Sequence, residues 1–409
     1  MTSHAYHADD AGLTVASLEF LASAAGQPLL QAATDAVRAG THQDVKTADR
    51  LRKLADAPDV RAALVIAAAS VKATAPKGKF ASLPFFWAVP EALEQATSLR
   101  VARYKAGLLP AGVTVFDCCA GIGGDALAFA QRHDVVAVES SAVRAWCIAQ
   151  NAKVAGVNDR LRVREMLLTP DHVPGDDHAF FHIDPARRSN NRRSHHYEDM
   201  QPGPDVIAAL IARMPRGMIK LSPGVDFDSL PPGRLELISE RGVVVQALLH
   251  VGDAAPECRT ATVIDDAVTS FTDRPALAET SATPGAFVFE LDGAFTRAQL
   301  AAAFAAQHQL AALTPDGGYL TGDSPIQHPA LTGFRVLSAL PYHEKQLLTA
   351  IKEIPPYSTR AIEVKTRGLP DLDTDVLQKK LARDAGACGL TVLLYRHDRQ
   401  IKAIIAARL

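Results

Sequence analysis

A glycine-rich turn is the first feature of the sequence whose residue types could do chemistry. It reads Asp117-Cys118-Cys119-Ala120-Gly121-Ile122-Gly123-Gly124, between an apolar run at 113–116 and a helix-like stretch from Ala126. Glycines let the backbone approach a ligand closely, and a helix that begins after such a turn offers free N–H groups. The turn predicts a nucleotide or nucleoside site at the carboxyl edge of a parallel sheet, although tight turns of this composition also serve structure alone.

A carboxylate follows at the end of the next apolar run. Glu139 lies 22 residues after Asp117 and closes the run 135–139. At this position a carboxylate can accept hydrogen bonds from both ribose hydroxyls. A solvated acid at a strand end is the alternative, and the glycine turn one crossover earlier favours the ribose role.

The spacing of the glycines separates two classes of cofactor. A dinucleotide site usually shows GxGxxG, but here the glycines stand at 121, 123 and 124, and Ala126 takes the third place. Asp117 opens the turn, and its carboxylate would repel a pyrophosphate but attract a cationic amino group. The pattern therefore favours S-adenosylmethionine, a cofactor that carries an α-amino acid.

The segment 115–126 resembles motif I of class I S-adenosylmethionine-dependent methyltransferases, in the form seen in RNA cap guanine-N2 methyltransferases such as trimethylguanosine synthase. In many of these enzymes an acid after the third strand contacts the adenine, whereas Leu167 stands at that place here, so we expect the backbone near Met166 to do so. The resemblance implies that Glu139 holds the ribose and that the methionine part is lined by Asp117, Ala120, Gly121 and Gly123.

A second motif follows the apolar run 180–183 and reads Asp184-Pro185-Ala186-Arg187-Arg188. It resembles the Asp/Asn-Pro-Pro-aromatic loop of amino-group methyltransferases, with alanine and arginine in place of the second proline and the aromatic residue. Because the methyl donor is already activated, catalysis needs mainly alignment. We expect Asp184 to orient or deprotonate the acceptor and Pro185 to shape the loop; the alternative is that Asp184 caps a turn.

Basic residues continue this loop as far as Arg193. Arg187 and Arg188 are expected to bind an anionic substrate such as a phosphate backbone, and Ser222, after a later strand, to line the acceptor pocket. A solvated loop and a turn-forming serine are the alternatives. Cys118 and Cys119 are interpreted as small packing residues, and no set of metal ligands is recognised.

The elements that must position these residues alternate between strand and helix from about residue 91. This alternation predicts an α/β fold with a Rossmann-like seven-stranded methyltransferase sheet. Helical periodicity predicts an N-terminal helical domain over 1–90, before the methyltransferase domain at 91–267. A connecting module over 268–334 and a small α+β domain over 335–409 complete the chain. The expected strands are 113–117, 135–139, 161–164, 180–184, 218–221, and a late pair, 243–251 and 260–265, close enough to pair antiparallel.

The wider pattern resembles a bacterial family with an Asp-Pro-Ala-Arg-Arg loop and a C-terminal THUMP-like domain. The stretches 94–98, 341–345 and 362–368 carry that similarity. THUMP domains bind structured RNA, so the resemblance implies methylation of a nucleobase amine in tRNA or another structured RNA. A methyltransferase for a small molecule or protein, and a catalytically inactive cofactor- and RNA-binding protein, are the alternatives.

The composition limits the remaining classes. The chain has 409 residues and a formal net charge of -2, so general basicity does not indicate nucleic-acid binding. No apolar run is long enough for a membrane span, and the N-terminus does not resemble a secretory signal, so a cytoplasmic protein is expected. The five scattered cysteines predict neither a disulfide framework nor a zinc site. The oligomeric state is not indicated.

Overall fold

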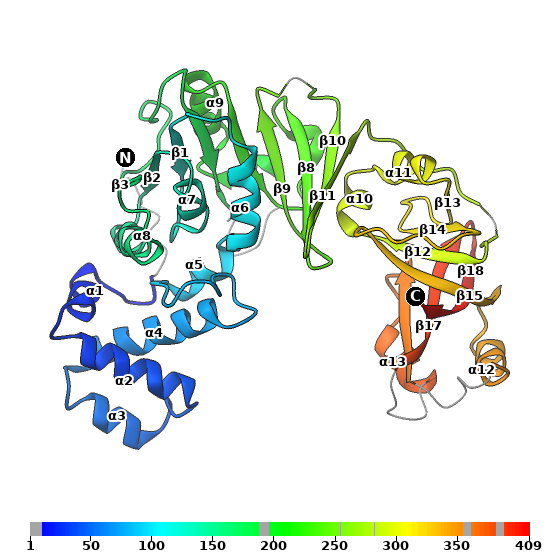
Figure 1. Ribbon diagram of the computed structural model, residues 1–409, viewed down its shortest axis with the longest axis horizontal. Coiled ribbons are helices and arrows are strands. Elements are labelled where there is room, and N and C mark those ends of the chain that lie inside the picture. Colours follow the sequence, from blue (N-terminus) through cyan, green and yellow to red (C-terminus); the bar gives the residue numbers. More distant parts are fainter. Residues whose placement is uncertain (1–9, 188–195, 254, 282, 355–360, 382–387) are drawn as a thin grey trace. The chain divides into compact units, whose positions relative to one another are not determined.

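The chain divides into two compact units (Figure 1). The first comprises Met1–Leu221, Val225–Pro231 and His250–Gly252, and the remaining residues form the second. The N-terminal helical segment thus shares a unit with the sheet that follows it, and 268–334 shares a unit with 335–409. The computed structural model describes residues 10–187, 196–253, 255–281, 283–354, 361–381 and 388–409.

Helices make up the beginning of the first unit. Three of them start at a side-chain cap, where Thr14, Asp56 and Ser98 accept hydrogen bonds from backbone N–H groups of the first turn. The alanine-rich helix at 57–74 is buried along much of its length and packs against its helical neighbours. The helices are α1 (Val15–Ala22), α2 (Gln27–Arg38), α3 (Val45–Leu51), α4 (Ala57–Thr74), α5 (Pro90–Gln95) and α6 (Leu99–Leu108).

A parallel sheet follows in the same unit, in the order β7-β4-β1-β2-β3. β1 lies between β2 and β4, and Asp117 is in register with Ala137 on one side and His182 on the other. Because the strands are parallel, their carboxyl ends meet at one edge, which carries the predicted site. The strands are β1 (Val115–Cys118), β2 (Val135–Glu139), β3 (Leu161–Glu165), β4 (Phe180–Ile183) and β7 (Gly217–Leu221), with helices α7 (Gly124–Phe129), α8 (Ala142–Ala155) and α9 (Pro204–Arg213).

Four further strands, in the order β11-β10-β8-β9, lie in the second unit except for the last two residues of β9. β10 runs parallel to β8 and antiparallel to β11, so the expected pairing of 243–251 with 260–265 is replaced by one in which β8 separates them. Neither β8 nor β11 was among the seven expected strands, because polar residues interrupt the first and most of the second is exposed. The strands are β8 (Arg234–Glu240), β9 (Val243–Val251), β10 (Arg259–Ile264) and β11 (Val268–Asp273).

The rest of the second unit is built on a seven-stranded sheet of order β13-β14-β12-β15-β18-β17-β16. The predicted boundary at 335 falls inside β15, so the connecting module and the C-terminal domain share this sheet. Two clusters of buried apolar residues form its core. Its elements are β12 (Phe287–Leu291), α10 (Gly293–Arg297), α11 (Ala301–Gln307), β13 (Ala311–Ala312), β14 (Tyr319–Gly322), β15 (Leu331–Pro341), α12 (Glu344–Lys352), β16 (Ala361–Arg367), α13 (Thr374–Leu381), β17 (Cys388–His397) and β18 (Gln400–Arg408).

Among the described residues, no helix combines the length and the apolar character that a membrane span needs. The same residues contain no cluster of three or more histidine, cysteine or acidic side chains arranged to hold a metal ion.

Candidate active site

The glycine turn leaves β1 through three residues with left-handed backbone angles. Cys119 has φ 58°, Gly121 φ 61° and Gly123 φ 89°, a region that glycine enters without steric cost. A Cβ atom on Gly123 would lie 3.2 Å from the Ile148 side chain, so this glycine permits close packing on α8. A Cβ atom on Gly121 would meet no protein atom within 4 Å. Gly121 therefore borders open space, as a backbone that contacts a ligand requires.

Glu139 is hydrogen-bonded to this turn. The Gly121 N–H donates to Oε2 at 2.8 Å, and the Ser141 N–H donates to Oε1 at 3.0 Å. Burial raises the pKa of Glu139, although these backbone donors oppose the shift. Each carboxylate oxygen has a second lone pair, so the group can still accept from ribose hydroxyls. The sequence indicated the carboxylate but not its bond to the turn.

The other predicted cofactor contacts lie nearby, with part of their backbone already engaged. The Ala120 N–H donates to the Val138 carbonyl, and the Met166 N–H donates to the Glu139 carbonyl. An adenine contact from the Met166 N–H would have to compete with that bond. Leu167 beside it is 62% exposed, so an apolar side chain stands where many relatives of the motif carry an acid.

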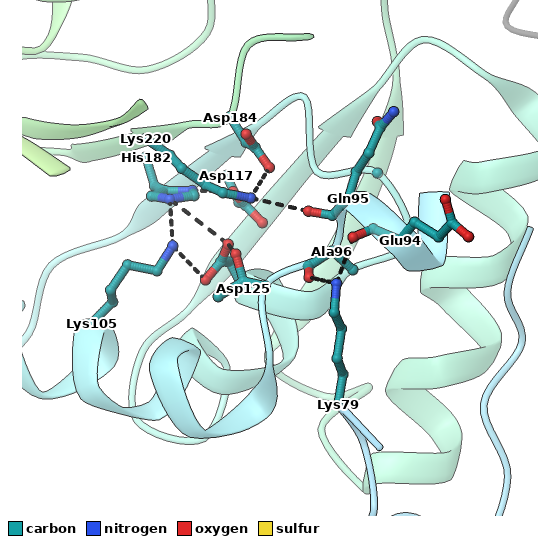
Figure 2. Close-up of polar contacts among 12 residues, drawn as sticks. Lys79, Glu94, Gln95, Ala96, Lys105, Asp117, Asp125, His182, Asp184 and Lys220 are labelled. Carbon is teal, nitrogen blue, oxygen red and sulfur yellow. Dashed lines mark hydrogen bonds and ion pairs between the residues drawn. The ribbon is translucent and has the colours of Figure 1, made fainter. Parts of the chain in front are cut away.

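The segment between α5 and α6 supports the turn from a distant part of the chain. Lys79 Nζ donates to the carbonyls of Glu94 and Ala96, both at 2.6 Å (Figure 2). Thr97 Oγ1 donates to Asp125 Oδ2 on α7 at 2.7 Å. A Cβ atom on Gly124 would lie only 3.0 Å from the Thr97 carbonyl oxygen. The stretch 94–98, noted in the sequence only by resemblance, thus packs directly against the start of α7.

Asn151 on α8 fixes the turn through its side-chain amide. Its Oδ1 accepts from the Trp87 N–H at 2.8 Å, and its Nδ2 donates to the carbonyls of Trp87 and Ile122 at 2.9 and 3.1 Å. The side chain is fully buried, so each of these bonds replaces one to water. Asn151 was not predicted from the sequence, although a polar residue inside an apolar helix face was an available signal.

Four buried polar side chains lie behind the turn, and we call them the buried charge chain: Asp117, His182, Lys105 and Asp125 (Figure 2). Asp117 Oδ1 lies 2.6 Å from His182 Nδ1, and Lys105 Nζ lies 3.0 Å from His182 Nε2. Lys105 Nζ also pairs with Asp125 Oδ1 at 2.7 Å. The chain therefore links β1, β4, α6 and α7 through side chains that water does not reach.

Burial and neighbouring charges act differently on the acids of this chain. Burial raises the pKa of Asp117, and contact with His182 only partly opposes it. Burial also acts to raise the pKa of Asp125, but Lys105, together with His182 and Lys220, outweighs it and holds that pKa well below its usual range. Burial lowers the pKa of Lys105 against the attraction of Asp125. The charge of the Asp125 carboxylate is thus compensated by the Lys105 ammonium, whereas no lysine or arginine is paired with Asp117 among the described residues.

Asp184 stands at the same edge, one residue beyond β4. Its N–H donates to the Cys118 carbonyl at 3.2 Å, and its Oδ2 pairs with Lys220 Nζ at 2.5 Å. Lys220 Nζ also donates to the Gln95 carbonyl at 3.2 Å, and Figure 2 shows it between these two oxygens. The Asp184 side chain is 30% exposed and that of Lys220 is 7% exposed. A ligand can therefore reach the Asp184 carboxylate while the Lys220 ammonium stays buried.

The remaining predicted site residues are placed less completely. Pro185 is buried, and Ala186–Arg187 form the short strand β5, antiparallel to β6 (Met200–Gln201). The side chain of Arg187 and the whole of Arg188 lie outside the described residues. Ser222 is buried and its hydroxyl accepts from the Gly224 N–H at 3.2 Å, so it forms the turn that follows β7.

These groups fit S-adenosylmethionine by their chemistry. Open space borders Gly121, and Glu139 retains acceptor capacity for a ribose. Asp117 Oδ2 is buried and has no hydrogen-bond partner among the described residues, so it retains acceptor capacity that a cationic amino group could use.

Comparisons with known proteins agree with this geometry. A sequence model of the family described as RNA cap guanine-N2 methyltransferase matches residues 112–167, which hold the glycine turn and Glu139. A protein from two strains of Mycobacterium tuberculosis, described as an uncharacterized S-adenosylmethionine-dependent methyltransferase, is 35% identical over 318 residues, which are 75% of this chain and 83% of the relative. A crystal structure from Porphyromonas gingivalis, provisionally described as a methyltransferase, superimposes with a TM-score of 0.71 at 18% identity, covering 93% of this chain and 98% of the other, and so shows the same fold. The chain belongs to the S-adenosylmethionine-dependent methyltransferases.

Proposed function

We propose that this methyltransferase transfers a methyl group to the exocyclic amine of a nucleobase in RNA, and that Asp184 contacts the acceptor. The position and exposure of Asp184 carry the proposal. It follows β4 at the edge that bears the glycine turn, and its side chain is partly exposed while its cationic partner is buried. The Asp184-Pro185 pair also resembles the start of the loop that amino-group methyltransferases use for the target amine.

The chemistry asks Asp184 to align a weak nucleophile. The lone pair of an exocyclic amine is delocalised into the base, and a carboxylate that accepts an amine N–H makes the nitrogen more nucleophilic. Bound S-adenosylmethionine supplies the activated methyl group. Lys220 Nζ donates to both Asp184 Oδ2 and the Gln95 carbonyl, so these contacts fix the orientation of the Asp184 carboxylate.

Two observations and one sequence resemblance support RNA as the substrate class. The family matched at 112–167 is described by its action on an RNA cap. The sequence after Asp184 is rich in arginine, which suits phosphate groups. The C-terminal part resembles a THUMP-like domain, and THUMP domains bind structured RNA.

The test uses RNA from a strain in which the gene for this protein has been deleted, because wild-type RNA would already carry the modification. Labelled S-adenosylmethionine and the protein are incubated with this RNA, and the digested nucleosides are separated. We expect label on an exocyclic amine. Asp184→Ala should transfer at least about 100-fold more slowly, and Asp184→Asn, which keeps an acceptor oxygen, should be intermediate. Asp171→Ala, at an exposed aspartate of the same unit, is the matched control.

Each part of the proposal can fail separately. Label in protein or in small molecules but not in RNA would reject the substrate class. Full activity of Asp184→Ala would reject the role of this carboxylate. Loss of S-adenosylhomocysteine binding in the same variant would show that Asp184 serves the cofactor and not the acceptor.

A further inference from the structure

The charges behind the glycine turn do not balance. Lys105 pairs with Asp125, and Lys220 pairs with Asp184. Asp117 is left with His182 as its hydrogen-bonding partner, and its Oδ2 contacts no donor among the described residues. An ionised carboxylate that is 1% exposed is costly unless a cation compensates it. An ionised Asp117 would therefore lack a compensating positive charge.

The position of the proton on His182 follows from its two neighbours. A lysine ammonium can only donate, so His182 Nε2 must accept from Lys105 Nζ at 3.0 Å. The ring proton then lies on Nδ1 and is donated to Asp117 Oδ1 at 2.6 Å. Lys105 thus selects the tautomer in which His182 Nδ1 donates to Asp117.

We propose that His182, with its tautomer selected by Lys105, is a positioning residue that presents Asp117 Oδ2 to the α-amino group of S-adenosylmethionine. The ammonium supplies the missing positive charge and the missing donor together. Asp117 and His182 are direct neighbours in the register of β1 and β4, so the sheet itself sets their separation. Lys105 is anchored in turn by Asp125, which Thr97 also contacts.

A pair of ligands isolates this contact without any methyl acceptor. S-adenosylhomocysteine carries the amino acid, whereas 5′-methylthioadenosine keeps the adenosine and the thioether but lacks the amino acid. In calorimetric titrations, His182→Leu should weaken S-adenosylhomocysteine about tenfold or more and change methylthioadenosine by less than about twofold. His182→Asn should recover most of the loss, because its amide can donate to Asp117 near the place of Nδ1.

A structural role alone would give a different pattern. If His182 only stabilised the sheet, both ligands would weaken together in His182→Leu, and that result would overturn the proposal. Unchanged affinity for both ligands would overturn it as well.

The wild-type protein provides a second measurement, which does not depend on the folding of a variant. Burial raises the pKa of Asp117, and a bound ammonium would displace its proton. The charged or titratable groups that interact with it are His182 from β4, Asp125 from α7, Lys105 from α6 and the adjacent thiols of Cys118 and Cys119. Titrations at mildly acidic pH, in buffers of different ionisation enthalpy, should show more protons released by S-adenosylhomocysteine than by methylthioadenosine. Equal release would contradict the proposal, and because no RNA is used, the outcome is independent of the proposed substrate.

Discussion

Two lysine–carboxylate pairs of nearly equal length show how differently the two units use charge. In the first unit, Lys105 and Asp125 are 2.7 Å apart, with side chains 0% and 7% exposed. In the second unit, Lys365 on β16 and Glu290 on β12 are 2.6 Å apart, with side chains 25% and 20% exposed. The N–O distances of the two pairs are nearly the same, but only the Lys105–Asp125 pair is almost completely removed from water.

The difference indicates where each unit carries a functional constraint. A pair near water gains little, because water solvates its charges almost as well as the partner does. A pair in the interior gives up that solvation, and removing one partner leaves the other charge buried without compensation. In the first unit the pair lies behind the glycine turn and orients His182. Around the sheet that carries Lys365 and Glu290, two clusters of buried residues are apolar, and the ion pairs that contact Glu290 stay partly exposed.

The largest expected effect is that of Lys105→Met. Removing the cation leaves Asp125 as an uncompensated buried charge, so the free energy of unfolding should fall by about 3–5 kcal/mol. Chemical denaturation followed by circular dichroism measures this change. The double variant Lys105→Met/Asp125→Leu should recover much of it, because it removes both charges. A cost below about 1 kcal/mol for Lys105→Met would mean that water reaches Asp125 in the interior and solvates its charge.

The next effect separates the conformation of a glycine from its place beside the ligand. Gly121 and Gly112 both have positive φ, at 61° and 73°, and a Cβ atom on either would meet no protein atom within 4 Å. Valine at either position should cost about 1–3 kcal/mol of stability through backbone strain. Gly121→Val should also weaken S-adenosylhomocysteine by about 100-fold or more, since its side chain enters the space expected for the ligand. Equal affinities in the two variants would remove Gly121 from the cofactor site.

Glu139 should give a somewhat smaller effect that depends on pH. Glu139→Ala should lose about 2–3 kcal/mol of affinity for methylthioadenosine, because two ribose hydrogen bonds disappear. Burial raises the pKa of Glu139, so in the wild-type protein its carboxylate takes up a proton at a higher pH than an exposed glutamate would. Methylthioadenosine affinity should therefore fall as the pH is lowered through the mildly acidic range. A decline of the same size in Glu139→Ala would assign the pH dependence to another group.

The sequence allowed the α/β fold and much of the candidate site to be predicted, because those signals are local. The glycine turn is a run of consecutive residues, and Glu139 and Asp184 each lie at or just beyond the end of a short apolar strand. A parallel sheet brings strand ends together, so a short pattern suffices to place such residues at one edge.

The buried charge chain could not be predicted in the same way. His182 is 65 residues from Asp117 and 77 from Lys105, and their contacts depend on strand register and on how α6 packs. A lysine on the apolar face of α6 and a histidine inside an apolar strand were the available signals, and neither names its partner. Strands β8 and β11 were missed for a related reason, since their polar residues are matched by neighbouring strands that the local pattern does not reveal.

The smallest expected effect completes the comparison of the two lysine pairs. Lys365→Met removes the lysine ammonium from a pair with nearly the same N–O distance as Lys105–Asp125, but the Glu290 carboxylate keeps access to water. The cost to the free energy of unfolding should be about 1 kcal/mol or less, several-fold below that of Lys105→Met, and S-adenosylhomocysteine affinity should not change. Both variants are measured in low and high salt, since an accessible pair is screened and a buried pair is not. A larger cost for Lys365→Met that is insensitive to salt would show that the Lys365–Glu290 pair also depends on a desolvated charge, and the contrast between the two pairs would no longer hold.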